Sequence, residues 1–275
     1  MEKSLESLKQ ITKAVREDII RMLTESGSGH PGGSLSAVEI MTTLYFNEMN
    51  VDIKNPKDPN RDRFVLSKGH AAPVLYSVLS EKGFFNKEEL MKLRKMGAML
   101  QGHPNMTYIP GVDMSTGSLG HGISAAVGMA LAGKLDKKDY RVYSLLGDGE
   151  LEEGQVWEAA MAAAHYNLDN LTAFVDFNGL QIDGDCSDVM NPNPIADKFV
   201  AFGWNVISLE DGHDLVAIKN AIEEGKKVKD KPTMIVCKTI KGKGVSFMEN
   251  EAGWHGSTPN KEQCDIALSE IGGEA

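Results

Sequence analysis

The sequence lacks the patterns that mark membrane and secreted proteins. No apolar run approaches the ~20 residues that a membrane-spanning helix requires. The first ten residues, MEKSLESLKQ, are charged and contain no apolar signal segment. Cysteine is scarce, and Cys186, Cys237 and Cys264 are far apart without a CxxC pair, which argues against a zinc site or a disulfide framework. We therefore expect a cytoplasmic protein with reduced thiols and no membrane partner.

Basic residues are in the minority. The chain has 29 Lys and Arg against 39 Asp and Glu, a net charge of −10, which argues against a non-specific nucleic-acid binder. Its 275 residues, 41% of them hydrophobic, suffice for a large apolar core. No linker or internal repeat divides them, so we expect one domain over residues 1–275.

Short apolar runs alternate with segments of helical periodicity along the chain. This alternation predicts an α/β fold whose mostly parallel sheet is covered by helices on both faces. We expect strands at residues 64–66, 142–146, 171–177, 204–209 and 233–239. We expect helices at residues 4–24, 36–49, 72–81, 87–96, 123–135, 195–202, 213–227 and 261–271.

One glycine pattern resembles a dinucleotide-binding motif but lies in the wrong structural context. Gly27, Gly29 and Gly32 form GxGxxG, but a dinucleotide-binding fingerprint follows a strand, whereas this one follows a predicted helix. A nicotinamide dehydrogenase is therefore the alternative that we favour least. We expect residues 26–34 to be an irregular loop, with Pro31 arguing against a helix that begins there.

The most informative stretch is residues 141–184. Asp148 follows the strand at 142–146, and Asn178 follows the strand at 171–177. A helix is expected between them, with Glu150, Glu152 and Glu153 in its first turn. The strands of such a β-α-β unit lie parallel and adjacent, so both polar residues should meet at the edge where α/β sheets bind ligands.

The oxygen atoms expected at this edge of the sheet are suited to a hard cation. We expect the Asp148 carboxylate, the Asn178 amide oxygen and the Leu180 carbonyl to bind Mg²⁺, with Ca²⁺ or Mn²⁺ as alternatives. Gly149 leaves its N–H open to an anion at the start of the helix. The plain structural alternative is that Asp148 caps a helix and Asn178 occupies a turn.

The residues of several segments narrow the choice. GDG, with a second strand and Asn178 thirty residues after Asp148, resembles the thiamine-diphosphate and magnesium motif of thiamine enzymes. DGELEEGQVWEA, FNGLQIDG, SGHPGGS, SKGHA, QGHP and WHG resemble segments of transketolase. The resemblance implies a thiamine-diphosphate-binding fold and transfer of a two-carbon ketol unit from a ketose phosphate to an aldose phosphate.

Histidines carry much of this resemblance. Six of the seven histidines adjoin a glycine, which suggests rings presented to a ligand on bare loops. The resemblance implies that His30 and His103 contact sugar hydroxyls and that His70 contacts the cofactor diphosphate. It places His255 between the diphosphate and the substrate. His121 stands where the family usually has Gln, so no role is transferred to it.

The resemblance also implies roles for several other residues. In TGSLGHG, the segment Gly117, Ser118 and Leu119 would line the thiazolium and diphosphate. Ile182 would pack on the thiazolium, and Glu153 would join a carboxylate network across a subunit interface. Lys241 and Lys243 either favour the diphosphate electrostatically or belong to a solvated loop.

The resemblance stops near the middle of a transketolase. We therefore expect a separate partner chain that carries the pyrimidine domain, with its catalytic glutamate, and the C-terminal domain. A heterotetramer with two copies of each chain is the simplest assembly. The alternatives are a 2-oxo-acid dehydrogenase α subunit, a 1-deoxyxylulose-5-phosphate synthase-like protein and a non-catalytic cofactor-binding subunit.

Overall fold

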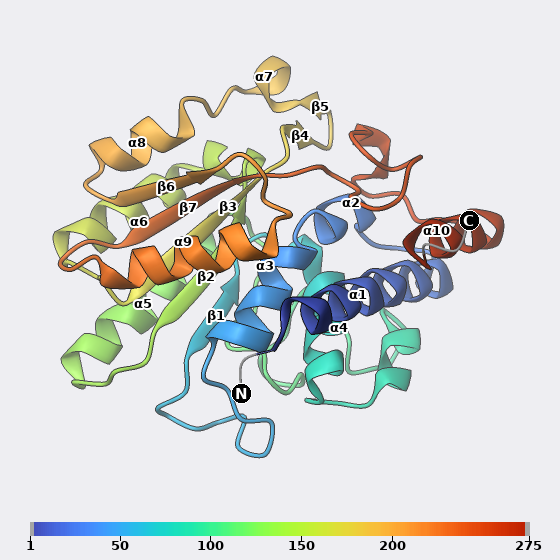
Figure 1. The fold of residues 1–275 in the computed structure, drawn as a ribbon, viewed down its shortest axis with the longest axis horizontal. Helices are drawn as coiled ribbons and strands as arrows, with labels where there is room; N and C mark the ends of the chain where they lie inside the picture. The colour runs from blue at the N-terminus through green and yellow to red at the C-terminus, as the bar shows by residue number, and fades with distance from the viewer. Residues whose placement is uncertain (1–2, 273–275) are drawn as a thin grey trace.

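The fold is built on a five-stranded parallel sheet (Figure 1). The structure is a computed structural model and describes residues 3–272. The strand order is β1-β2-β3-β7-β6. The strands are β1 (Arg63–Leu66), β2 (Val142–Gly147), β3 (Leu171–Phe177), β7 (Thr233–Lys238) and β6 (Asn205–Leu209).

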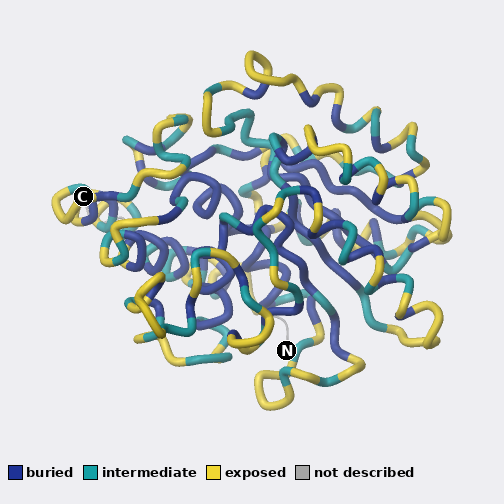
Figure 2. The backbone as a smooth tube through the Cα atoms, turned by 180° about the vertical axis from the view of Figure 1, so that it is seen from behind, coloured by how far each residue is buried: buried dark blue, intermediate teal, exposed yellow. Residues whose placement is uncertain are grey.

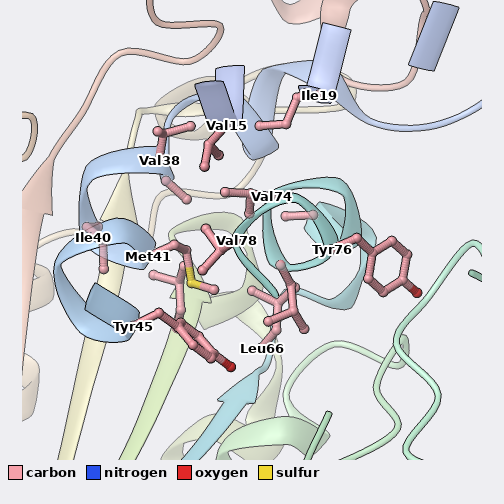
Figure 3. Packing of buried hydrophobic residues seen from close by; sticks show 14 of the residues in the cluster. Val15, Ile19, Val38, Ile40, Met41, Tyr45, Leu66, Val74, Tyr76 and Val78 are labelled. Carbon is pink, nitrogen blue, oxygen red and sulfur yellow. The ribbon is translucent and has the colours of Figure 1, made fainter. Parts of the chain in front are cut away.

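Helices cover both faces of this sheet, as predicted. Successive residues of a strand point to opposite faces, and accordingly Phe174 joins one apolar cluster whereas Ala173 and Val175 join the other. The first cluster lies under α1 (Leu5–Ser26), α3 (Val38–Thr43), α4 (Ala72–Lys82) and α9 (Leu215–Lys227). Figure 3 shows residues from α1, α3 and α4 packed together in this cluster. The second lies under α5 (His121–Leu135), α6 (Gly154–His165) and α8 (Ile195–Ala201). The predicted α/β fold is confirmed: β1, β2, β3 and β7 are largely buried between the two layers (Figure 2), and the edge strand β6 is partly exposed.

The glycine pattern near the N-terminus does follow a helix. Gly27 ends α1 in the left-handed conformation, with φ 62°, where its N–H donates to the Leu23 carbonyl. The expectation that no helix begins at Pro31 is wrong, because α2 (Pro31–Leu35) starts there. Proline is well tolerated at the first helical position, where its missing N–H has no intrahelical partner in any case.

Other predicted helices differ in type or length. The segment at 87–96 forms only a 3₁₀ helix, η3 (Lys87–Lys92), and the Asn86 side chain does not cap it. The helix expected directly after Asp148 is split into a 3₁₀ turn, η4 (Gly149–Glu152), and α6, because Glu153 is extended. The remaining elements are η1 (Leu44–Glu48), η2 (Gly69–Ala71), β4 (Leu180–Gln181), β5 (Gly184–Asp185), α7 (Cys186–Val189), η5 (Ala252–Trp254) and α10 (Lys261–Gly272).

Two further findings bear on the sequence analysis. All three cysteines are buried and free. Over residues 3–272, no helix has the length and apolar character to cross a membrane.

Candidate active site

A cavity of about 140 Å³ opens at the carboxyl edge of β2 and β3. Gly147 at the end of β2 pairs with Asp176 of β3, so the residues that follow these two strands meet there. The predicted site residues among its lining are His70, Leu119, Asp148, Gly149, Asn178, Leu180, Ile182 and His255. The parallel β-α-β unit therefore brings Asp148, Gly149, Asn178, Leu180 and Ile182 to one cavity, which His70, Leu119 and His255 line from other segments.

Asp148 is almost fully buried at the base of this cavity. Its carboxylate accepts hydrogen bonds from the backbone N–H groups of Gly149, at 2.9 Å, and Gly179, at 2.5 Å. Burial, and then the negative charge of Asp176, raise the pKa of Asp148 to about 6. A cation bound beside this carboxylate would relieve both effects.

The other two predicted metal ligands lie in the same cavity. The Asn178 side-chain oxygen accepts from the Leu180 N–H at 3.1 Å, and the Leu180 carbonyl accepts from Lys241 Nζ at 2.8 Å. Within the described part of the chain, no group of three or more His, Cys, Asp and Glu side chains is placed to hold a metal ion. The available donors are instead one carboxylate, one amide and one carbonyl, and this set of hard oxygens fits Mg²⁺.

A buried ion pair that the sequence analysis missed supports the floor of the cavity. Lys68 Nζ lies 2.5 Å from Asp176 Oδ2 and also donates to the Gly33 carbonyl at 2.6 Å. Asp176 further accepts from Ser36, Thr239 and the Asn178 side-chain amide. Although burial opposes its charge, Lys68 lowers the pKa of Asp176. An aspartate inside the otherwise apolar run LTAFVDF was the available signal.

Lys241 also belongs to this cavity, so the solvated-loop alternative for it is wrong. Its side chain is only 2% exposed, and Nζ lies 3.0 Å from His255 Nδ1. Burial lowers the pKa of Lys241 to about 8, against the opposing charges of Asp148 and Asp176. A buried cation thus faces the cavity.

Three predicted histidines form a cluster above the floor. The ring centroids of His30 and His70 are 5.2 Å apart, those of His70 and His255 are 5.2 Å apart, and those of His30 and His255 are 5.6 Å apart. Burial, followed by neighbouring positive charges, lowers the pKa of His30 to about 4 and that of His255 to about 3. These imidazoles are therefore neutral at pH 7, and each can donate and accept one hydrogen bond.

His103, Gly117 and Ser118 line a second cavity, of about 550 Å³, together with His121. A Cβ added to Gly117 would lie 3.2 Å from His103 Cγ, so the imidazole packs directly on this loop. Burial, then Arg94 and then His103 lower the pKa of His30.

The structure places Glu153 outside both cavities and brings Glu150 inward instead. Glu153 is exposed, whereas Glu150 is buried. The Glu150 carboxylate accepts from Ser67 Oγ, from the Gly120 N–H at 2.9 Å and from the Gly147 N–H at 3.1 Å. It thereby joins the Gly117–Gly120 loop to the end of β2. The three closely spaced glutamates offered no signal to distinguish these roles.

Apolar groups complete the mouth of the first cavity. Leu119 and Ile182 line it from two different loops. Ile182 is 64% exposed, and a large aliphatic side chain held in solvent at a cavity mouth is suited to cover an apolar ring. The cavity therefore combines oxygen ligands, buried cations and an apolar rim.

The chain is similar to known proteins over nearly its whole length. Residues 7–274 match the family described as transketolase, thiamine diphosphate binding domain. The chain is 46% identical to the 6-deoxy-6-sulfo-D-fructose transketolase subunit SqwG of Clostridium sp. (strain MSTE9), with 96% of this chain and 98% of that one covered. It is 42% identical to an apulose-4-phosphate transketolase subunit of Phocaeicola vulgatus, with 97% and 94% covered.

A full-length transketolase gives the same result in three dimensions. The Pichia stipitis enzyme, solved in complex with sedoheptulose 7-phosphate, superposes with a TM-score of 0.91 at 34% identity, covering 96% of this chain and 40% of that one. The chain thus spans less than half of that enzyme but nearly the whole of the two subunits. These matches favour transketolase over the other thiamine enzymes considered, and the chain belongs to the transketolase family, as its thiamine diphosphate binding domain.

Proposed function

We propose that this chain is the diphosphate-binding subunit of a two-chain, Mg²⁺-dependent transketolase located in the cytoplasm. The complex would transfer a two-carbon ketol unit from a ketose phosphate to an aldose phosphate. Bound thiamine diphosphate would supply the nucleophilic carbon for this transfer. The observation that carries the proposal is the shared cavity of Asp148, Asn178, Leu180 and Lys241.

The chain's own residues would divide the work of holding the cofactor. Asp148, Asn178 and the Leu180 carbonyl would hold Mg²⁺ against the diphosphate. His70, Lys241 and the backbone of Gly149 would contact the diphosphate oxygens. Ile182 and the segment Gly117, Ser118 and Leu119 would lie against the thiazolium ring.

The histidines would orient the sugar. His255 lines the first cavity, His30 lies against His255, and His103 lines the second cavity. The depressed pKa values of His30 and His255 keep their rings neutral. Neutral imidazoles suit hydroxyl groups, since one ring nitrogen donates while the other accepts. We propose that His30 and His103 bind substrate hydroxyls and that His255 transfers a proton or donates to either partner.

A second chain would complete the enzyme. We propose that it carries the pyrimidine and C-terminal domains with a catalytic glutamate, and that two copies of each chain assemble. The outer face of α5 supports docking of this chain. Gly128, Ala132 and Leu135 are exposed along one face of this helix, whose residues are mostly small and apolar. Glu153, exposed near Gly120 at the start of α5, would join a carboxylate network there.

The central test is the metal-dependent binding of thiamine diphosphate to the co-expressed chains. We expect Asp148→Ala to abolish metal-dependent cofactor binding in a calorimetric titration with Mg²⁺. The substitution replaces the only carboxylate among the three proposed ligands with a methyl group. Asp188→Ala, on the exposed turn α7, is the matched control and should bind normally. Cofactor binding with unchanged magnesium dependence in Asp148→Ala would overturn the assignment.

A product assay separates the proposed reaction from its rivals. With the partner chain, thiamine diphosphate and Mg²⁺ present, we expect ketol transfer between sugar phosphates and no decarboxylation of 2-oxo acids. The reverse result would favour a 2-oxo-acid dehydrogenase subunit. Cofactor binding without any activity would favour a non-catalytic subunit.

A further inference from the structure

A buried polar network behind the cavity grips the loop that carries Lys241. We propose that Arg16, Glu39 and His213, here called the clamp, are positioning residues that fix Lys241 for binding the cofactor diphosphate. The inference deepens the proposed function, since it rests on Lys241 facing that diphosphate. None of the three clamp residues lines the cavity itself.

Glu39 is the centre of the clamp. Its two oxygens lie 2.7 and 2.9 Å from the guanidinium nitrogens of Arg16, and Oε2 also lies 2.9 Å from His213 Nδ1. The side chains of all three are about one-tenth exposed or less. Although burial opposes its charge, Arg16 and then His213 lower the pKa of Glu39 to about 2. The centre of the clamp is therefore a carboxylate at neutral pH.

The clamp reaches the loop on both sides of Lys241. His213 Nε2 accepts from the Ile240 N–H at 2.9 Å, and Arg16 Nε donates to the Lys243 carbonyl at 3.1 Å. Glu39 thus connects the residue before Lys241 to the second residue after it through two side-chain bridges. Helices α1 and α3 supply Arg16 and Glu39, and His213 precedes α9, so three separate segments hold the loop.

These contacts define the tautomer of His213. A carboxylate can only accept a hydrogen bond, so Nδ1 must carry the proton that faces Glu39. The Ile240 N–H can only donate, so Nε2 must be unprotonated. The clamp therefore requires a neutral imidazole with its proton on Nδ1, and this requirement can be observed without any ligand.

The loop has little freedom once the clamp is formed. Gly242 has φ 79°, and a Cβ there would lie 2.3 Å from the Met248 carbonyl oxygen. The Gly242 N–H donates to the Gly32 carbonyl at 3.1 Å, which ties the loop to α2. Lys241 then extends from this fixed backbone to the Leu180 carbonyl and to His255. Its ammonium group is held in place before any ligand arrives.

A role in positioning explains why charged groups are buried here. Buried ion pairs contribute little net stability compared with apolar residues of the same volume, because desolvation offsets their attraction. They do impose direction, since each hydrogen bond is satisfied in one geometry only. Through these directional hydrogen bonds, the clamp would orient Lys241 without contacting its ammonium group.

Two variants of His213 distinguish a role in positioning Lys241 from a role in stability alone. In His213→Gln the side-chain oxygen can reach the position of Nε2 and accept from Ile240, whereas the shorter Asn side chain cannot. In calorimetric titrations of the co-expressed chains with thiamine diphosphate and Mg²⁺, we expect His213→Asn to weaken binding about tenfold, the effect of one lost hydrogen bond. We expect His213→Gln to restore most of the affinity. Equal affinity in both variants and the wild type would overturn the proposal.

The control measurements use the full chain without cofactor. Nitrogen chemical shifts of His213 should show a protonated Nδ1 and a bare Nε2; the opposite tautomer would refute the clamp. Amide exchange at Ile240 should accelerate in His213→Asn and remain slow in His213→Gln. If wild-type protein shows this tautomer but does not bind thiamine diphosphate, the proposed function fails and the diphosphate role of the clamp fails with it. If the wild type binds thiamine diphosphate but the two His213 variants do not show the expected difference in affinity, the clamp proposal fails and the proposed function stands.

Discussion

Lys241 holds its ammonium nitrogen 2.8 Å from the carbonyl oxygen of Leu180, one of the three oxygens proposed to bind Mg²⁺. The Lys241 ammonium group thus lies next to the proposed binding site of the metal and the diphosphate. Asp148 and Asp176 supply the opposing negative charge. This relationship links the metal ligands to the diphosphate contacts.

Removing the charge of Lys241 should weaken cofactor binding without lowering the stability of the fold. Lys241→Met keeps most of the side-chain volume but eliminates a buried cation whose pKa is lowered to about 8 by burial. We expect thiamine diphosphate to bind at least about tenfold more weakly, because a charge-assisted contact is lost. The free energy of unfolding should not fall, since desolvation of the ammonium group no longer opposes folding. Calorimetric titration and urea unfolding measure the two effects, with Lys243→Met as the control.

Glu150 should matter for stability although sequence alone did not single it out. Its carboxylate accepts from three donors, so Glu150→Gln would place an amide NH₂ against N–H and O–H groups. We expect a loss of about 2 to 3 kcal/mol in the free energy of unfolding, typical of a disrupted buried charged hydrogen-bond network. Denaturant titration measures this loss. The exposed neighbour Glu152 provides the control: Glu152→Gln should change stability little, and an equal effect at both positions would contradict the account.

Asp18 should give the protein a measurable pH dependence. One of its oxygens lies 3.0 Å from Lys87 Nζ, and the other is buried without a hydrogen-bond partner among the described residues. Burial raises its pKa to about 7 against the attraction of Lys87, with Glu81 adding to the rise. Between about pH 4 and 7 the folded state therefore binds more protons than the unfolded state, so this group's contribution to stability decreases as pH rises.

The difference between wild type and Asp18→Asn isolates this contribution. Relative to the variant, the wild type should lose unfolding free energy across that pH range, by about 1 kcal/mol or more at pH 7. Urea unfolding at several pH values measures it. The exposed substitution Asp139→Asn should show no such divergence. A constant difference between wild type and Asp18→Asn from pH 4 to 7 would refute the assignment.

The outer face of α5 offers a test of partner docking. A Cβ at Gly128 would meet nothing within 4 Å, so the chain itself tolerates a larger residue there. We expect Gly128→Arg to prevent copurification of the second transketolase chain, because it places a long cation on an apolar face. Gly128→Ala should keep the complex and gain about 0.5 to 1 kcal/mol from its higher helix propensity. Normal assembly of Gly128→Arg would place the interface elsewhere.

The sequence predicts a contact well where the order of neighbouring elements along the chain determines their arrangement in space. Asp148 and Asn178 each follow an apolar strand of one β-α-β unit, and parallel pairing then brings them together. Lys68, Asp176 and the Arg16–Glu39–His213 clamp could not be predicted in this way. Their partners lie far apart in the chain, and only the packed structure pairs them.

Local errors had local causes. The sequence pattern argues against a helix that begins at Pro31, yet Pro31 occupies the first position of α2, where proline is well tolerated. Glu153 is expected inside a helix, but it occupies the N-cap position of α6 without a side-chain capping bond, and Glu150 points inward instead. Which of several adjacent acids faces the core depends on the turn geometry, which the spacing of acids does not determine.

The strand order has a consequence for how the chain is made. Strand β7 inserts between β3 and β6, although it is the last strand of the sheet in sequence. Until residues 233–238 leave the ribosome, β3 and β6 are separated by a gap with unsatisfied hydrogen-bonding edges on both sides. The five-stranded sheet therefore cannot be completed until its last strand has been synthesised.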